Sequence, residues 1–214
     1  MARSLKSDSG ELALVMTGCW PDPEDGAGSG ELRELVRLAK SGDLEAFEQV
    51  IILHQRRVFL TALGMLGRVE DAQDAAQEVF FRLYRHLRGF DESRDFTAWL
   101  YRVTVNVCRD IARSRGKHDL PSLEALGGLE EAATGAPDPS DQAASVQQIH
   151  IVQQALKRLP EKERAAVVLR DIEGLSTREV ARILGSSQAT VRSQVSAARL
   201  KIKRFTERFL RGRP

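Results

Sequence analysis

Hydrophobic positions recur along this chain at intervals of three and four residues, the period of an amphipathic α-helix. In the first part of the chain this pattern predicts a short helix from Glu31 that stops at Ser41-Gly42. A longer helix follows, capped by Asp43 and broken by Gly67. Two more helices are predicted at about 69–87 and 96–114, joined by the polar loop 88–95. No segment alternates long enough to indicate a strand, so we expect an all-α fold.

A second helical block begins at Val146. Its first helix is predicted to end at Pro160, which starts another helix that stops near Glu173-Gly174. Ser176 and Glu179 have the spacing of a capping box, which opens a short helix ending at Gly185. Ser186 or Ser187 then caps a last helix that runs to about Leu210. A short capped helix, a glycine turn and a longer helix form the layout of a helix-turn-helix.

Between and before these blocks the periodicity disappears. Residues 1–29 end in a run rich in Pro, Gly and Asp, which predicts a disordered leader, and 116–145 is a Gly- and Pro-rich acidic stretch typical of a flexible linker. We therefore expect two small helical domains, at 30–115 and 146–214, joined by that linker.

The charge is strongly segregated although the formal net charge is only +2 over 214 residues. The linker carries one basic residue against six acidic ones, whereas 186–214 carries eight basic residues against one acidic residue. The stretch 82–116 is also basic. Two basic regions separated by an acidic connector indicate two contacts with a polyanion, although a basic helix can also simply face solvent.

Composition and cysteine usage exclude several classes. No uncharged stretch is long enough to cross a bilayer, no signal peptide is recognisable, and Cys19 and Cys108 lie far apart without metal-ligand neighbours. The four histidines fall on different segments, and no phosphate-binding glycine loop occurs. We therefore expect a cytoplasmic protein that is not an enzyme, with no catalytic residues, metal or cofactor.

The predicted last helix has two distinct faces. Val191, Val195, Ala198 and Ile202 form a packing stripe, while the opposite face is basic and polar. Side chains of this kind reach base edges and phosphates in a DNA major groove. In the first block, the segment 90–106 places aromatic rings beside arginines and an asparagine, a combination that suits single-stranded nucleic acid. Phe96, Trp99 and Leu100 can equally be core residues.

The two blocks together resemble the extracytoplasmic-function sigma factors of bacterial RNA polymerase. The resemblance covers roughly 32–114 and 146–205, in family order and spacing. It rests on Asp74–Tyr84, Phe96–Asn106, Leu159-Pro160, Leu169–Ser176, Glu179–Gly185 and Thr190–Ser193.

This resemblance implies a promoter-specificity subunit that binds core RNA polymerase and promoter DNA, with regions 2 and 4 of a sigma factor as its two domains. Region 2 would dock on the β′ clamp helices and capture a base of the melted −10 element. Region 4 would bind the −35 element as a duplex, with its flank on the β flap. An anti-sigma factor is implied as a further partner, and no membrane insertion is expected.

The resemblance also implies three sets of site residues. The polymerase-binding set lies on the polar stripe of the third predicted helix: Asp71, Asp74, Gln77, Glu78 and Arg82. The −10 set is Phe90, Arg94, Trp99, Arg102, Asn106 and Arg109. The −35 set is Arg178, Gln188, Thr190, Arg192, Ser193, Gln194, Ser196 and Arg199.

The chain departs from the family pattern on the predicted recognition helix. Relatives usually have an arginine where this chain has Gln194, and often another basic residue where it has Ala197. Fewer phosphate or guanine contacts are therefore expected on this face, and Gln194 suits adenine.

A stand-alone helix-turn-helix regulator that binds duplex operators is the alternative interpretation. It leaves 31–114 without a role. Tight binding to core polymerase with weak binding to duplex DNA would favour the sigma factor, and tight operator binding alone would favour the regulator.

Overall fold

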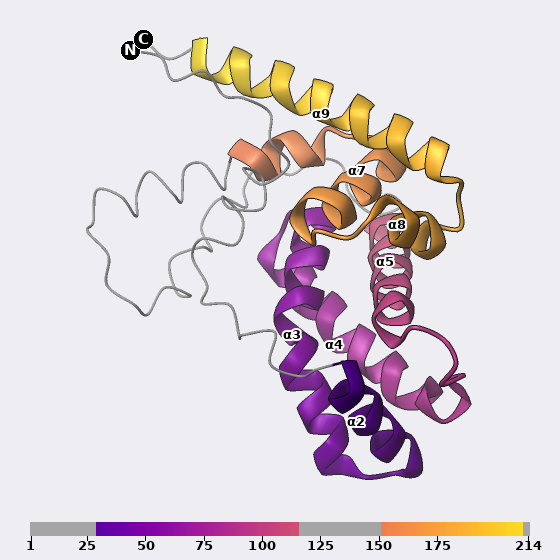
Figure 1. The fold of residues 1–214 in the computed structure, drawn as a ribbon. Coiled ribbons are helices and arrows are strands. Elements are labelled where there is room, and N and C mark those ends of the chain that lie inside the picture. Colours follow the sequence, from indigo (N-terminus) through magenta and orange to yellow (C-terminus); the bar gives the residue numbers. More distant parts are fainter. Residues whose placement is uncertain (1–28, 116–150, 212–214) are drawn as a thin grey trace, which may run out of the picture.

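The computed structural model describes residues 29–115 and 151–211, and these residues contain helices and no strand (Figure 1). The first range, here the N-terminal half, holds α2 (Ser29–Ser41), α3 (Leu44–Leu66), α4 (Val69–His86) and α5 (Phe96–Arg115). A 3-10 turn, η1 (Leu87–Gly89), leads from α4 into the loop before α5. The predicted linker, and all but the last residue of the predicted leader, lie outside the described residues.

Local side-chain chemistry sets the ends of the N-terminal helices, as predicted. The Asp43 carboxylate accepts a hydrogen bond from the backbone N–H of Ala46 at 3.0 Å, which caps α3. Gly67 ends α3 in the left-handed conformation at φ 75°, and its N–H donates to the carbonyl of Leu63. This tight turn lets α4 fold back along α3, so α3 and α4 form a helical hairpin.

The second described range, here the C-terminal half, begins with a helical stretch at 151–157. It continues with α7 (Glu161–Val167), η2 (Val168–Ile172), α8 (Thr177–Leu184) and α9 (Gln188–Arg211). The predicted capping box is confirmed, because the Ser176 hydroxyl and the Glu179 carboxylate each accept from the other residue's backbone N–H. Gly185 ends α8 at φ 62°. Of the two candidate caps for α9, Ser187 is the one that accepts from the N–H of Thr190.

The helix predicted from Pro160 to Glu173 is not uniform. After α7 the backbone widens into the π-helical segment η2, closed by a hydrogen bond from the N–H of Glu173 to the carbonyl of Val168 at 3.0 Å. A π segment holds one more residue in a turn than an α-helix, which rotates everything after it. In this chain the segment buries Val168, Leu169, Asp171 and Ile172.

The two halves share one hydrophobic core. The predicted packing stripe of the last helix is confirmed, because Val191, Val195, Ala198 and Ile202 are all buried. Helices α3 and α5 of the N-terminal half pack against α7, η2 and α8 of the C-terminal half. Helix α9 lies along one side of the molecule, across α7 and α8 and away from α2 (Figure 1).

Candidate nucleic-acid interface

Helix α4 presents the predicted polar stripe, with one change of membership. Asp74 and Gln77 are exposed, and Glu78 is partly exposed. Arg82 donates to Glu78 at 2.6 Å and to Asp110 of α5 at 3.0 Å, so its guanidinium joins α4 to α5. Hydrogen bonding to these carboxylates raises the pKa of Arg82. The stripe therefore offers one amide and two carboxylates to a partner.

Asp71 does not belong to this exposed stripe, and the prediction that it does is wrong. The residue is only 2% exposed, and its carboxylate accepts a hydrogen bond from Arg115 at the end of α5. Position 71 lies in the first turn of α4, where the helix faces the last turn of α5. Asp71 can therefore tie α4 to α5, and a partner that needed its carboxylate would have to displace Arg115.

The stripe continues into aromatic side chains that the sequence reasoning missed. Phe81 is 55% exposed and Tyr84 is 54% exposed, one and two turns beyond Gln77 on α4. The Tyr84 ring lies 5.2 Å from that of Phe47 in α3, and Arg85 lies over the Phe81 ring. The signal was present in the sequence as the Phe80-Phe81 pair, since two adjacent helical residues cannot both face the core.

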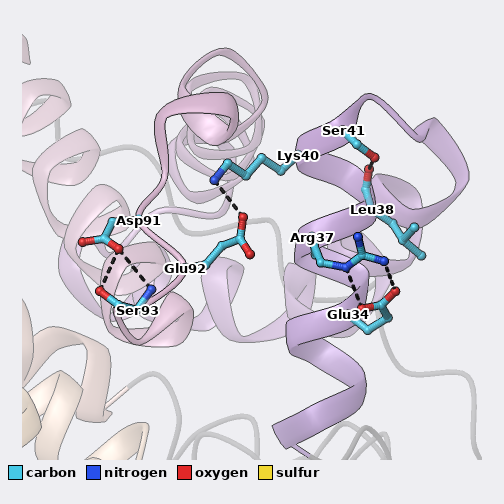
Figure 2. Close-up of polar contacts among 8 residues, drawn as sticks. All are labelled: Glu34, Arg37, Leu38, Lys40, Ser41, Asp91, Glu92 and Ser93. Carbon is cyan, nitrogen blue, oxygen red and sulfur yellow. Dashed lines mark hydrogen bonds and ion pairs between the residues drawn. The ribbon is translucent and has the colours of Figure 1, made fainter.

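The loop between η1 and α5 is held by α2 and by its own side chains. Lys40 of α2 forms an ion pair with Glu92 at 2.8 Å, and both the backbone N–H and the hydroxyl of Ser93 donate to Asp91 (Figure 2). Asp95 then accepts from the N–H of Ala98 at the start of α5. A short polar loop is thereby kept in one shape beside the aromatic residues that flank it.

Those aromatic residues form a cluster rather than a row of exposed rings. Phe90 is buried, stacks on Trp99 at 4.8 Å, and meets Phe96 edge-on at 5.6 Å. Phe96 and Leu100 are core residues, as the alternative interpretation held, and Trp99 is partly exposed. An open cleft of about 830 Å³ lies against this cluster. Its wall includes Phe90, Arg94, Trp99 and Arg102.

From the wall of the cleft onward, α5 carries Arg102, Asn106 and Arg109 at intervals of four and three residues, so they share one face of the helix. Arg102 and Asn106 are exposed. Arg109 donates to Glu161 of α7 at 2.7 Å. Four members of the −10 set thus have side chains that reach solvent: Arg94, Trp99, Arg102 and Asn106. Arg109 is paired with Glu161, and the Phe90 ring stacks against Trp99.

Helices α8 and α9 form the predicted helix-turn-helix, and most of the −35 set lies on its outer face. The exposed members are Arg178, Gln188, Thr190, Arg192, Ser193 and Ser196. The Thr190 hydroxyl lies 2.9 Å from that of Ser187, so it also belongs to the cap of α9. Gln194 is partly buried, and its Oε1 finds no hydrogen-bond partner among the described residues. This acceptor is itself buried, so the structure does not present it on the surface, and contact of Gln194 with DNA stays a prediction.

Arg199 has a different environment from the rest of the −35 set. Its guanidinium donates twice to Asp171 of η2, at 2.8 and 2.6 Å, and the side chain of Asp171 is fully buried. This two-bond pairing holds α9 against η2. Its proposed contact with DNA stays a prediction, but its geometry fits a residue that positions the recognition helix.

Metal-binding clusters, reactive cysteine or histidine side chains and membrane-spanning helices are the other functional features to consider in the described part of the chain. Residues 29–115 and 151–211 contain no group of three or more His, Cys, Asp or Glu side chains that could hold a metal ion. Cys108 is buried, which raises the pKa of its thiol to about 12. His54 is buried beside Phe96, and this burial, together with Arg57, lowers its pKa to about 4. None of the described helices is both long enough and apolar enough to span a membrane.

Comparison with known proteins agrees with this arrangement. The family model for sigma-70 region 2 matches residues 50–118, and the model for sigma-70 region 4 matches residues 149–202. The ECF RNA polymerase sigma factor SigM of Mycobacterium tuberculosis is 33% identical over 172 residues, which cover 80% of this chain and 83% of SigM. The ECF RNA polymerase sigma-E factor of Escherichia coli K12 is 30% identical over 186 residues, covering 83% of this chain and 95% of the relative.

The two models define a two-region protein of the sigma-70 class, with region 2 in the N-terminal half and region 4 in the C-terminal half. The chain belongs to the ECF RNA polymerase sigma factors. Among solved structures, CnrH in complex with the cytosolic domain of CnrY is similar, with a TM-score of 0.62 and 26% identity over 82% of this chain and 96% of that chain. RpoE of Bartonella quintana, solved with the anti-sigma factor NepR, shares the fold, with a TM-score of 0.59 over 75% of this chain and 96% of that chain.

Proposed function

We propose that this sigma factor binds core RNA polymerase, recognises a −35 duplex with α9, and captures a base of the melted −10 element beside α5. The observation that carries the proposal is the separation of two unlike surfaces. One is the polar and basic outer face of a helix-turn-helix. The other is a cleft walled by a loop, an aromatic cluster and Arg102, with the exposed amide of Asn106 one turn further along α5. The first suits a duplex and the second suits an extruded base.

Docking on the polymerase is assigned to α4. Its exposed stripe offers Asp74, Gln77 and Glu78 for polar contacts, and Phe81 and Tyr84 add apolar area at the end of the same stripe. Exposed aromatic residues beside polar ones are typical of protein–protein interfaces. The β′ clamp helices are the partner that family membership suggests for this stripe, and the β flap is the partner suggested for the C-terminal half.

Capture of the −10 base is assigned to the cleft. Extruding a base costs a few kcal/mol, which stacking and hydrogen bonds in the pocket must offset. The Trp99 ring, supported by Phe90, can stack on a base, and the Asn106 amide has two donors and one acceptor for its edge. Arg94 and Arg102 are placed to meet the neighbouring phosphates.

Regulation by an anti-sigma factor is part of the proposal. CnrH was solved with the cytosolic domain of CnrY, and the Bartonella quintana RpoE was solved with an anti-sigma factor. We expect such a partner to compete with the polymerase for the surfaces described above. We also expect the protein in the cytoplasm, where bacterial promoters and polymerase are found.

The experiment that tests the proposal is run-off transcription by purified core polymerase on a pooled promoter library, with and without this protein. Transcripts that depend on the protein and start behind shared −35 and −10 sequences support it. If no such transcript forms and core polymerase does not co-purify, the proposal fails and the operator-binding interpretation takes its place.

Asn106→Ala tests the −10 assignment. We expect it to weaken open-complex formation by about 1–3 kcal/mol, the usual cost of losing a specific base contact, while core binding stays unchanged. Gln55→Ala, which removes an exposed amide from α3, is the matched control. Equal losses of core binding and open-complex formation in Asn106→Ala would contradict base capture.

Arg192→Ala and Gln194→Ala test the −35 assignment. Both should change which −35 sequences are used while leaving the −10 preference as it is. An unchanged −35 profile would remove these residues from the recognition surface.

A further inference from the structure

A second groove, of about 460 Å³, lies on the C-terminal half and shares no residue with the cleft beside the aromatic cluster. It runs between the first helical stretch of that half and the last turns of α9. Ala155 and Leu159 are buried in its lining, and the rings of Phe205 and Phe209 lie 6.2 Å apart along it. The match to region 4 ends at residue 202, so both rings belong to the part of α9 beyond the family model.

Basic side chains surround these two rings. Arg158 lies over one of them, with its Cζ 4.5 Å from the ring centroid. Lys201 also lines the groove, but its charge is paired with Glu163 at 2.7 Å. Arg204 and Arg208 are exposed in the lining, and neither makes an ion pair or hydrogen bond with another described residue. An apolar groove with two such cations suits an occupant that is both apolar and acidic.

A segment of this chemistry occurs in the predicted linker, outside the described residues. The segment 119–131 carries four acidic side chains and no basic one, and its leucines recur every three positions, at 120, 123, 126 and 129. Pro121 and the pair Gly127-Gly128 disfavour an α-helix here. In a polyproline-type extended conformation three residues make one turn of about 9 Å, which would place all four leucines on one side.

The length of the groove fits this spacing. Lys201 and Phe209 are the first and last residues of α9 that line it, and they are separated by about 12 Å along the helix axis. Two neighbouring leucines about 9 Å apart can therefore lie in the groove together. The carboxylates next to them would then face Arg204 and Arg208.

Both ends of the linker lie near the groove. Its C-terminal end leads directly into the helical stretch at 151–157, which contributes Ala155 to the lining. Its N-terminal end follows Arg115, which pairs with Asp71, and the Asp71 carboxylate interacts electrostatically with Lys157 beside the groove. Residue 119 is four positions beyond Arg115, at most about 14 Å of chain. The linker therefore starts and ends within reach of the groove.

We propose that the segment 119–131 docks in this groove of its own chain, with two leucines against Phe205 and Phe209 and its carboxylates on Arg204 and Arg208. Charge complementarity and the position of both linker ends favour this occupant over a separate acidic chain. Attachment at both ends keeps the segment at an effective concentration of about 1 mM, so an affinity of about 100 µM would fill the groove about ten to one. This inference does not rest on the proposed function, because it concerns only where the chain holds its own linker.

Variants of the linker and of the groove test the docking separately. Replacing the four leucines at 120, 123, 126 and 129 by serine should empty the groove without changing any described residue. In that serine variant, Arg204→Glu and Arg208→Glu together reverse the charge of the groove, and both side chains are exposed, so the fold is kept. Lys203→Glu is the matched control, because it makes the same charge change at an exposed position of α9 that does not line the groove.

The experiment measures fluorescence anisotropy of a labelled peptide with the sequence of 117–133, added to the full-length proteins. We expect the serine variant to bind the peptide about tenfold more tightly than the wild type, whose groove is already filled. Arg204→Glu with Arg208→Glu should then weaken binding about tenfold, whereas Lys203→Glu should leave it unchanged. A peptide with lysine at 124, 130 and 131 should recover binding to the charge-reversed groove.

Each other outcome overturns a stated part of the proposal. Equal binding by the wild type and the serine variant overturns docking within the chain, since the groove is then open to a separate acidic chain. No binding by the serine variant, or equal losses in the groove and control variants, overturns the groove as the site. If the difference from the wild type disappears on dilution of the protein, the linker of a second copy fills the groove instead. Run-off transcription tests the proposed function independently of all these results.

Discussion

Acidification should destabilise the N-terminal half through a single buried imidazole. His54 in α3 is 6% exposed, its Nε2 has no hydrogen-bond partner among the described residues, and its pKa is lowered to about 4 by burial and by Arg57. The unfolded chain has an ordinary histidine pKa near 6.5. Between these two values the unfolded state binds the proton and the folded state does not, so stability falls as the pH falls.

The magnitude follows from the two pKa values. At pH 7.5 both states are neutral at this site and the free energy of unfolding has its full value. At pH 5 the unfolded imidazole is almost fully charged while the folded one is not, which costs about 2 kcal/mol. Because the two halves share one core in a chain of 214 residues, the melting temperature should fall by roughly 4–8 °C from this residue alone.

The assay compares urea unfolding of the wild type with that of His54→Leu at pH 7.5 and pH 5, followed by circular dichroism. His54→Leu should be no less stable at pH 7.5, because it removes a buried nitrogen that lacks a partner. Its advantage over the wild type should grow by about 2 kcal/mol at pH 5. His86→Leu, which removes an exposed imidazole from α4, controls for the loss of a histidine as such. Parallel pH dependences in the wild type and His54→Leu would refute the reasoning.

Three further predictions concern the helix-turn-helix and the core. Arg199→Ala should cost about 3–5 kcal/mol in urea unfolding because it leaves Asp171 buried without its partner. Arg199→Lys, which keeps the charge but loses the two-bond geometry, should cost clearly less; equal costs would mean that the geometry is unimportant. Ser176→Ala should cost about 1 kcal/mol in the same assay by removing the cap of α8, and no change would show that the cap contributes nothing. In a Cys19→Ser background, Cys108 should resist iodoacetamide in the native protein and react after unfolding in guanidinium, since burial raises its pKa to about 12; rapid native labelling would contradict its burial.

The helices and their ends could be predicted from the sequence because local chemistry determines them. Asp43, the Ser176–Glu179 capping box and Gly185 act within one turn of the backbone, and all three were identified from spacing alone. The packing stripe of α9 was equally accessible, since a period near 3.6 residues places its members on one face.

Features that depend on distant segments could not be predicted in this way. Asp71 has the pattern of an exposed residue, and only its approach to Arg115, 44 residues later, makes it an internal one. Phe81 and Tyr84 have the composition of core residues, yet among the described residues both side chains stay more than half exposed, with only the Tyr84 ring in contact with Phe47 of α3. The contact between the halves depends on two residues that are 109 positions apart and share no period. Gly64 of α3 has no side chain to keep Val168 of η2 away, and Glu173 accepts hydrogen bonds from the hydroxyls of Thr61 and Tyr101. Which of the predicted site residues the fold exposes and which it buries therefore depends on contacts between distant segments.

Because of the π segment η2, the fit between the two halves depends on the exact number of residues between α7 and α8. A π turn contains one residue more than an α turn, so deleting a single residue from 168–172 would restore an ordinary helix without breaking it. The side chains that follow would then be rotated by about 100° relative to α7. Glu173 would turn away from Thr61 and Tyr101, while the helix-turn-helix beyond it could still fold. A one-residue gap at this place in a related sequence would therefore mark a sigma factor whose two halves do not fit together in this way.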